Sequence, residues 1–289
     1  MQLTVMSLNF KYAGRTDSDG RPDPRWPDQV DIIRKVDPHI LLGQEAHGWE
    51  ADPRLQADAE HDLGMRAHVA PSKSGAHTVV MHRPDVLRWR HWETKYARES
   101  RHGFGVAVFD VIADPKMKVP LTVISAHLHP SSAQKAATEA QVLIERLYRY
   151  GGMGLLGGDI NHLGPADTDP DWSTVPPYNR SSRCYRRAVP DGPWLGNPLV
   201  ALTLADGDLY DVAELIADRE GDEAADKELL APTGHNGGVR TDQFWVTDNM
   251  ADAVLGYQRI PTGKASDHDA IVATIDTAAL HEVEAREWI

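Results

Sequence analysis

Residues 153–161 read Met153-Gly154-Leu155-Leu156-Gly157-Gly158-Asp159-Ile160-Asn161. A short apolar run of this kind is typical of a buried strand, and the glycines then lead to a carboxylate and an amide. A bare turn explains the glycines, but it does not explain why the preceding run is so apolar. We therefore interpret this stretch as a strand that presents Asp159 and Asn161 at its end.

The same arrangement recurs along the chain, where apolar, β-prone runs end at polar side chains. One run ends at Asn9, the next at Glu45, and a third at His127. Rigid scaffolds present reactive side chains at such strand ends. The strands predicted in this way are 3–8, 40–45, 78–81, 106–112, 121–126, 153–156, 243–246 and 270–275.

Helical spacing of apolar residues predicts one helix from Pro27 to Val36, stopped by Asp37-Pro38, and another from Pro130 to Gly151. A terminal helix is predicted over 278–288. The basic, aromatic stretch 88–101 and the proline-, glycine- and arginine-rich stretch 162–198 are interpreted as loops. The alternation predicts an α/β fold of two packed sheets covered by helices. We expect one domain over 1–289, with a loop insertion at about 162–198.

Composition sets limits on the class of protein. The chain has 289 residues, 41% of them hydrophobic, which is enough for a sizeable core. A net charge of −13 argues mildly against tight, non-specific binding of nucleic acid, although a local basic patch remains compatible with a nuclease. No apolar run is long enough for a membrane span, and no signal peptide is expected. The single cysteine, Cys184, favours a reducing, cytoplasmic location.

The strand-end residues indicate hydrolysis of a phosphate ester. Carboxylates of Glu45, Asp159 and Asp267, with the amide oxygens of Asn9 and Asn161, are the hard ligands that suit Mg²⁺ or Mn²⁺ rather than Zn²⁺. Such a metal neutralises phosphate charge and polarises the P–O bond.

A proton must also leave the attacking water. His268 is a candidate acceptor, and Asp242 is a candidate to orient its imidazole, by the logic of acid–histidine pairs.

Six short motifs follow one another along the chain, each after an apolar strand. They are Ser7-Leu8-Asn9, Gln44-Glu45, Ser125-Ala126-His127-Leu128, Gly158-Asp159-Ile160-Asn161, Arg240-Thr241-Asp242 and Ser266-Asp267-His268. Each motif alone is weak, but six in this order form a strong signal. In this order of motifs the chain resembles the endonuclease/exonuclease/phosphatase superfamily.

This resemblance implies a four-layered α/β sandwich of the deoxyribonuclease I type, with two mixed sheets flanked by helices. It implies Mg²⁺ held chiefly by Glu45, with Asn9 and Asp267 nearby. Asp159 and Asn161 would position the nucleophilic water and contact the phosphate.

The resemblance also implies roles for the histidines. His127 would donate to a phosphate oxygen. His268, paired with Asp242, would act as the base or as a phosphate ligand. The chain departs from the superfamily pattern in the residues Thr241 and Gln243 that flank Asp242 and in the long segment after Asn161.

Other interpretations remain open at this point. His127 and His129 form a His-x-His pair, which also fits zinc, although a zinc hydrolase needs more histidines at strand ends. Arginines in the long loop are either a solvated face or a phosphate-binding flap with aromatic side chains that stack on a base or sugar. A second such mixture includes Arg101, with Trp89 and Trp92 as either stacking or packing residues. The candidate substrate-binding residues are Trp172, Tyr178, Arg180, Arg183, Arg186, Arg187 and Arg101.

The leading hypothesis is a metal-dependent phosphodiesterase that acts on DNA or RNA. A second keeps the metal and the fold but takes a small-molecule, sugar or lipid phosphate, which the acidic net charge favours. A lipid substrate is less favoured because no amphipathic membrane-binding helix is evident. A third hypothesis is a non-catalytic binding protein, which is expected to lack a metal ligand or the base.

Overall fold

The computed structural model describes residues 1–235 and 238–286, and twelve strands form two six-stranded sheets. The first sheet contains β1 (Gln2–Asn9), β2 (Ile40–Gln44), β3 (Arg66–Val69), β4 (Val79–His82), β11 (Val254–Ile260) and β12 (Ala270–Asp276). The second contains β5 (Leu87–Glu93), β6 (Val106–Val111), β7 (Leu121–His127), β8 (Gly154–Asp159), β9 (Leu209–Asp211) and β10 (Asp242–Thr247).

Both sheets are mixed. Their strand orders are β11-β12-β1-β2-β4-β3 and β5-β6-β7-β8-β10-β9. In each sheet one central pair is parallel, β1 with β2 and β7 with β8, and the remaining pairs are antiparallel. The carboxyl ends of both parallel pairs carry the polar residues that the sequence singles out.

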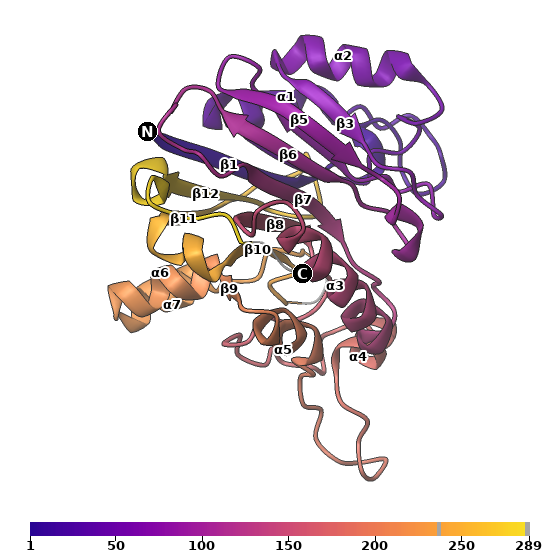
Figure 1. The fold of residues 1–289 in the computed structure, drawn as a ribbon. Coiled ribbons are helices and arrows are strands. Elements are labelled where there is room, and N and C mark those ends of the chain that lie inside the picture. Colours follow the sequence, from indigo (N-terminus) through magenta and orange to yellow (C-terminus); the bar gives the residue numbers. More distant parts are fainter. Residues whose placement is uncertain (236–237, 287–289) are drawn as a thin grey trace.

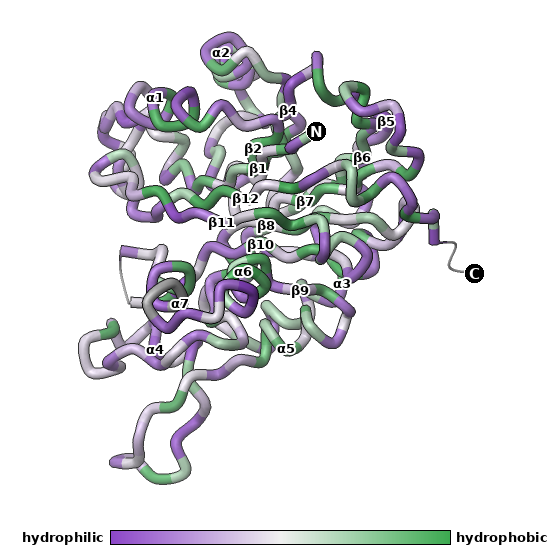
Figure 2. The backbone as a smooth tube through the Cα atoms, turned by 90° about the vertical axis from the view of Figure 1, so that its left-hand side faces the viewer, coloured by the Kyte–Doolittle hydropathy of each residue, from purple (hydrophilic) through white to green (hydrophobic). Residues whose placement is uncertain are grey.

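The helices cover the outer faces of the sheets (Figures 1 and 2). α1 and α2 lie over the first sheet, and α3 and α5 lie over the second. The helices are α1 (Trp26–Val36), α2 (Pro53–Leu63), α3 (Ala133–Tyr148), α4 (Pro177–Arg183), α5 (Leu199–Asp206), α6 (Val212–Glu220) and α7 (Glu223–Leu229), and short 3-10 turns are η1 (Tyr12–Gly14), η2 (Ala97–Glu99), η3 (Asp248–Ala253) and η4 (Thr277–Leu280).

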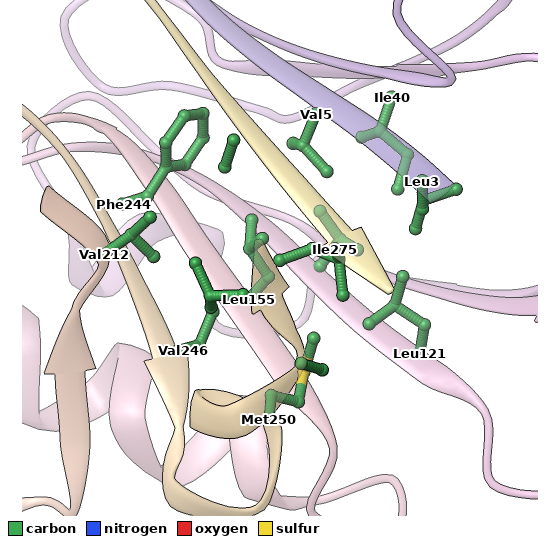
Figure 3. Packing of buried hydrophobic residues seen from close by; sticks show 14 of the residues in the cluster. Leu3, Val5, Ile40, Leu121, Leu155, Val212, Phe244, Val246, Met250 and Ile275 are labelled. Carbon is green, nitrogen blue, oxygen red and sulfur yellow. The ribbon is translucent and has the colours of Figure 1, made fainter. Parts of the chain in front are cut away.

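The main core lies between the two sheets (Figure 3). Leu3 and Val5 of β1 pack in the same cluster as Leu155 of β8 and Phe244 of β10. Within the second sheet, Phe244 of β10 pairs directly with Gly157 of β8, and a Cβ on Gly157 would lie 2.3 Å from the Phe244 ring. Glycine is therefore required at this position in β8 by packing.

The alternate residues of the same strands face the helices, as the two-residue period of a strand requires. Met6 and Leu8 of β1 pack with Val30 and Ile33 of α1. On the opposite side, Trp245 of β10 packs against the α3 and α5 side chains. The order helix, sheet, sheet, helix confirms the four-layered α/β sandwich expected from the sequence.

Two local predictions were wrong. The stretch 88–101 contains strand β5 rather than a loop alone, and Arg88 and Arg90 pair with Asp110 on the neighbouring β6. The Trp89 ring is 50% exposed at this sheet edge, whereas Trp92 packs against the main core.

The terminal helix predicted over 278–288 is also wrong for the described part of the chain. Only η4 is helical, and residues 281–286 form no helix. His281 instead bonds through its ring to Asp114, and only Val283 in this segment packs against the core. Residues 287 and 288 of the prediction lie outside the described residues.

The segment 162–198 is not wholly a loop, because it contains α4. Figure 1 shows the chain between α4 and α5 projecting from the body of the molecule. No helix in the described residues has both the length and the apolar character needed to cross a membrane.

Buried Arg240 anchors the start of this segment to β10. Its side chain is fully buried, and it donates to Asp167 at 2.8 Å and to Asp211, the N-cap of α6, at 2.9 Å. Two buried carboxylates thus depend on one guanidinium that lies just before Asp242.

Arg240→Gln should lower the free energy of unfolding by about 3–5 kcal/mol, because it leaves Asp167 and Asp211 buried without their cation. Urea denaturation followed by tryptophan fluorescence measures this change. Arg54→Gln is the matched control, since Arg54 pairs with Asp52 at an exposed position, and it should leave stability almost unchanged. Equal losses in the two variants would contradict the anchoring role.

Candidate functional site

Side chains along β1 point alternately to the two faces of the sheet, which places Asn9 on the face between the two sheets. Leu3 and Val5 point into the main core, so Ser7 and Asn9 continue the same face toward the carboxyl end of the strand. In the other central strands, too, every second side chain faces the space between the sheets. This alternation brings four further polar residues to the same edge of that space: Gln44 of β2, His127 of β7, Asp159 of β8 and Asp242 of β10.

A buried polar layer separates this edge from the apolar core. The Gln44 amide donates to Ser7 Oγ at 3.2 Å and to Ser125 Oγ at 3.1 Å, which joins the first sheet to the second. Ser125 in turn donates to the carbonyl of Gly43 at 2.9 Å. Buried amides and hydroxyls are stable when paired in this way, so the layer supports the polar residues beyond it.

Asp159 lies at the centre of the cluster. Its neighbours within the sheet are His127 on one side and Asp242 on the other. Asp159 Oδ2 lies 3.5 Å from His127 Nε2, 3.8 Å from His268 Nε2 and 3.5 Å from Asn9 Nδ2. Burial raises the pKa of Asp159, and the Asp242 carboxylate adds to this effect against the charge of His268.

Asn161 follows Asp159 in the left-handed region, with φ of 65°. Its backbone N–H donates to Asp159 Oδ1 at 3.0 Å, and its amide donates to the carbonyl of Leu128 at 3.1 Å. These bonds fix both side chains relative to the end of β7. A left-handed conformation is uncommon for a side chain other than glycine, and such positions cluster at functional sites.

Glu45 is the second such residue, with φ of 57° directly after β2. Its carboxylate accepts from Asn9 Nδ2 at 3.3 Å and from the backbone N–H of Tyr12 at 3.1 Å. Asn9 therefore bridges Glu45 and Asp159, which come from different sheets.

His268 is held by Asp242 through a 2.8 Å bond at Nδ1, which directs Nε2 toward Asp159. Thr241 also donates to the same Asp242 oxygen. Burial alone would lower the pKa of His268, but the charges of Asp242 and Asp159 outweigh it and raise the pKa to about 10. The raised pKa favours the imidazolium form of the ring at neutral pH.

His127 has the opposite character. It is buried and stacks on His102, with the ring centroids 3.9 Å apart. Burial, with the charge of His268 as a smaller cause, lowers the pKa of His127 to about 3. His127 is thus a neutral donor or acceptor beside a charged histidine.

Asp267 lies at the margin of the site. Its carboxylate is partly exposed and lies 3.6 Å from the Lys11 ammonium. The neighbouring Ser266 hydroxyl donates to the carbonyl of Asn9 at 2.7 Å, which ties the Asp267–His268 loop to the end of β1. The structure thus places Asp267 near Asn9 but gives its carboxylate a cationic partner.

The donor set fits a hard divalent cation. The carboxylates of Glu45 and Asp159 converge on the Asn9 amide nitrogen, and the Asn9 amide oxygen accepts from the backbone N–H of Lys11. Carboxylate and amide oxygens are the ligands that such a cation prefers. The buried Asp242 Oδ1 has no hydrogen-bond partner. Ligand atoms of Asp159, Asp242 and His268 also lie within 4.8 Å of one another, which makes a second candidate grouping. We favour the Glu45 side for a cation, because the short His268–Asp242 hydrogen bond already uses those two groups.

Solved structures provide a comparison for this arrangement. The fold is similar to an endonuclease/exonuclease/phosphatase protein from Bacteroides vulgatus, with a TM-score of 0.65, 12% identity and coverage of 96% of this chain and 99% of that chain. It is also similar to D. rerio TDP2 complexed with a single-strand DNA product, with a TM-score of 0.61, 13% identity and coverage of 96% and 99%.

The chain has the endonuclease/exonuclease/phosphatase fold. The endonuclease domain of TRAS1, a telomere-specific non-LTR retrotransposon, is a third similar structure, with a TM-score of 0.56, 12% identity and coverage of 96% and 99%. At such low identities the likeness shows the fold alone. No protein-family model and no curated protein matches the sequence.

Within this endonuclease/exonuclease/phosphatase fold, the long segment does not provide all the contacts expected of it. Trp172 is only 5% exposed and packs with Leu163, Val175 and Cys184, so its ring is not free to stack on a substrate. Its assignment as a stacking residue was wrong.

The arginines of this segment have different surroundings. Arg183 is buried, and its Nε donates to the carbonyl of Asn161 at 2.8 Å, so it supports the site rather than forming part of an open flap. Arg180 donates to the carbonyl of Trp172, and Arg180 and Arg187 both lie over the Trp194 ring.

The remaining candidates of this segment are exposed. Arg186 is an exposed residue of the projecting loop, and the Tyr178 side chain is 70% exposed on α4. Arg101 is also exposed, next to the buried His102.

Several site residues were missed from the sequence. His102 stacks on His127 but follows no apolar strand-like run. Lys11 pairs with Asp267 and comes two residues after Asn9, the polar end of the first run. The roles of Gln44 and Ser125 as inter-sheet partners were also missed, although both lie in motifs. A usable signal was present for them: polar residues at inward-facing strand positions need partners. Among the described residues, no group of metal-binding side chains contains both His127 and His129, which leaves the zinc alternative without support.

In the metal-free protein the His268 imidazole should titrate near pH 10, well above the ordinary value of about 6.5. Asp242→Asn should lower this pKa, because it removes the carboxylate that contacts the ring. Long-range ¹H–¹⁵N NMR spectra recorded across the titration measure the effect. A wild-type value near 6.5, or no change in the variant, would contradict this electrostatic account.

The same pairing links stability to pH. The pKa of His268 is higher in the folded state than in the unfolded state. The contribution of the His268–Asp242 ion pair to the free energy of unfolding is therefore fully present below about pH 6.5 and is lost as the pH rises toward 10. In EDTA, the stability difference between the wild type and Asp242→Asn should therefore shrink from pH 6.5 to pH 9.5, as measured by urea denaturation. A constant difference would speak against the ion pair.

Proposed function

We propose that this protein is a divalent-metal-dependent phosphoesterase that hydrolyses phosphodiester bonds, with a nucleic acid as its substrate. The observation that carries the proposal is the cluster around Asp159, in which an Asp242–His268 pair and the Asn9–Glu45 pair meet at one edge. This is the combination of charge neutralisation and proton handling that phosphate ester hydrolysis requires.

Glu45 and Asn9 would hold Mg²⁺ or Mn²⁺, with Asp267 at the margin of the same site. When bound, the metal supplies positive charge that offsets the phosphate and polarises the scissile bond. The backbone N–H of Asn161 donates a hydrogen bond to Asp159, which fixes the two residues relative to each other. We propose that these two residues orient the attacking water.

The two histidines are assigned different tasks. His127 is neutral and buried, and we assign its Nε2 as a donor to a phosphate oxygen. His268 carries a raised pKa, which favours a charged contact to the phosphate over a neutral base. Asp242 is a positioning residue that orients the ring and stabilises its charge.

The neighbouring structures support a nucleic acid as substrate. D. rerio TDP2 is complexed with a single-strand DNA product, and the TRAS1 domain is an endonuclease. Exposed Tyr178 and Arg186 also remain available for nucleic acid contacts. The single cysteine still favours a cytoplasmic location, which stays a prediction.

A small phosphate ester is the second candidate substrate. It is favoured by the net charge of −13, and also by Trp172 and Arg183, which are buried and so unavailable to a long substrate. Release of phosphate from a panel of sugar phosphates and nucleotides, compared with cleavage of oligonucleotides, separates the two candidates.

Glu45→Gln and His268→Ala should each lower turnover of an oligonucleotide in Mg²⁺ by about 10²–10⁴-fold without unfolding the protein. Cleavage followed on denaturing gels measures turnover, and EDTA should abolish it. Glu220→Gln and His61→Ala change exposed residues of the same types and serve as matched controls. Full activity in either site variant would show that its role is misassigned.

Cation binding has a readout that does not depend on turnover. Mn²⁺ should raise the thermal unfolding midpoint of the wild type, because a ligand that binds only the folded state stabilises it. The rise should be much smaller in Glu45→Gln and unchanged in Glu220→Gln. A full rise in Glu45→Gln would place the cation elsewhere.

A further inference from the structure

A cavity of about 550 Å³ lies beside the candidate site, with His129, two residues after His127, in its lining. Its lining includes Lys73, Arg101 and Lys135, together with Glu99 and Glu139. These residues come from three separate parts of the chain: the loop before β4, the loop before β6 and the first two turns of α3. The cavity is therefore formed by the fold rather than by one flexible segment.

The cavity and the site share a wall. Arg101 is followed by His102, which stacks on His127 with the ring centroids 3.9 Å apart. The backbone N–H groups of Arg101 and His129 donate to the two oxygens of Glu139, at 2.8 Å and 2.7 Å. These bonds hold the edge of the cavity against the end of β7, where His127 lies.

The cavity lining carries more positive than negative side chains. Lys73, Arg101 and Lys135 are exposed, and none of them forms an ion pair within the described residues. The Glu139 carboxylate is buried, accepts two backbone bonds and interacts electrostatically with Arg101 and Lys73. The lining thus holds three cations and two carboxylates, of which only Glu99 is exposed, in a protein whose net charge is −13.

We propose that this cavity binds the phosphate that neighbours the scissile phosphate on a single strand of DNA. The inference rests on the proposed function and extends it, because it requires a substrate with at least two phosphates. Three cations in a confined pocket fit one backbone phosphate of a strand, whereas duplex binding usually uses a broad basic face. The strand runs from the Asp159 cluster past His127 to Arg101, Lys73 and Lys135.

Equilibrium binding tests the proposal without catalysis. The probe is a fluorescein-labelled single-stranded DNA 12-mer, titrated with the full chain in EDTA and followed by fluorescence anisotropy. The triple variant Lys73→Gln, Arg101→Gln, Lys135→Gln should weaken binding about tenfold or more. The slope of log Kd against log salt should fall by about 0.7, as for the loss of one phosphate contact on a single strand.

The matched control removes the same charge elsewhere. Lys35, Lys116 and Lys118 are exposed and lie outside the cavity, and their replacement by Gln should leave the Kd within about twofold of the wild-type value. Equal weakening in the two triple variants would overturn the proposal, as would a wild type that does not bind the probe.

A second measurement separates this proposal from the proposed function. Bis(p-nitrophenyl) phosphate has one phosphorus atom and cannot reach the cavity with a second phosphate. Its hydrolysis in Mg²⁺ should fall far less in the cavity variant than kcat/KM for the 12-mer, which falls through a raised KM. If the wild type does not hydrolyse bis(p-nitrophenyl) phosphate, the proposed phosphoesterase activity is rejected. If the cavity variant binds the 12-mer as well as the wild type does, only the proposed role of the cavity is rejected.

Discussion

Burial of one face of each sheet against the other is the constraint on which the site depends. Since side chains alternate along a strand, a residue that faces the main core fixes the direction of every second residue after it. Leu155 and Asp159 share a face for this reason, as do Phe244 and Asp242. A one-residue slip of any of these strands would turn its polar end away from the site.

A few hydrogen-bonded polar groups lie between the apolar core and the polar site. Gln44 joins the two sheets through Ser7 and Ser125, and Arg240 joins β10 to Asp167 and Asp211. Such fully paired networks hold side chains in one arrangement, while a half-paired network would be costly. The acidic cluster beyond them is different, because its carboxylates are partly uncompensated, which is the condition that favours a bound cation.

Much of the architecture was predictable because strand ends carry a local signal. The central strands appear in the sequence as short apolar runs. Most of the residues that meet around Asp159 were predicted because they stand at the polar ends of these runs. The predictions that failed concern residues whose placement depends on tertiary contacts. The edge strand β5 alternates exposed arginines with aromatic rings, so its sequence resembles that of a loop. Trp172 packs in a small apolar cluster within the long segment. His102 lies in a loop, so its stacking on His127 depends on chain geometry that no local pattern encodes.

The bond from Ser266 to the carbonyl of Asn9 joins residues 257 positions apart, and β12 pairs directly with β1. The edge of β1 therefore stays uncovered until β12, far along the chain, has paired with it. Asn9 and Glu45 cannot meet His268 before these distant segments come together. Assembly of the reactive centre is thus tied to long-range closure of the first sheet, and such distant closure is expected to make folding slow.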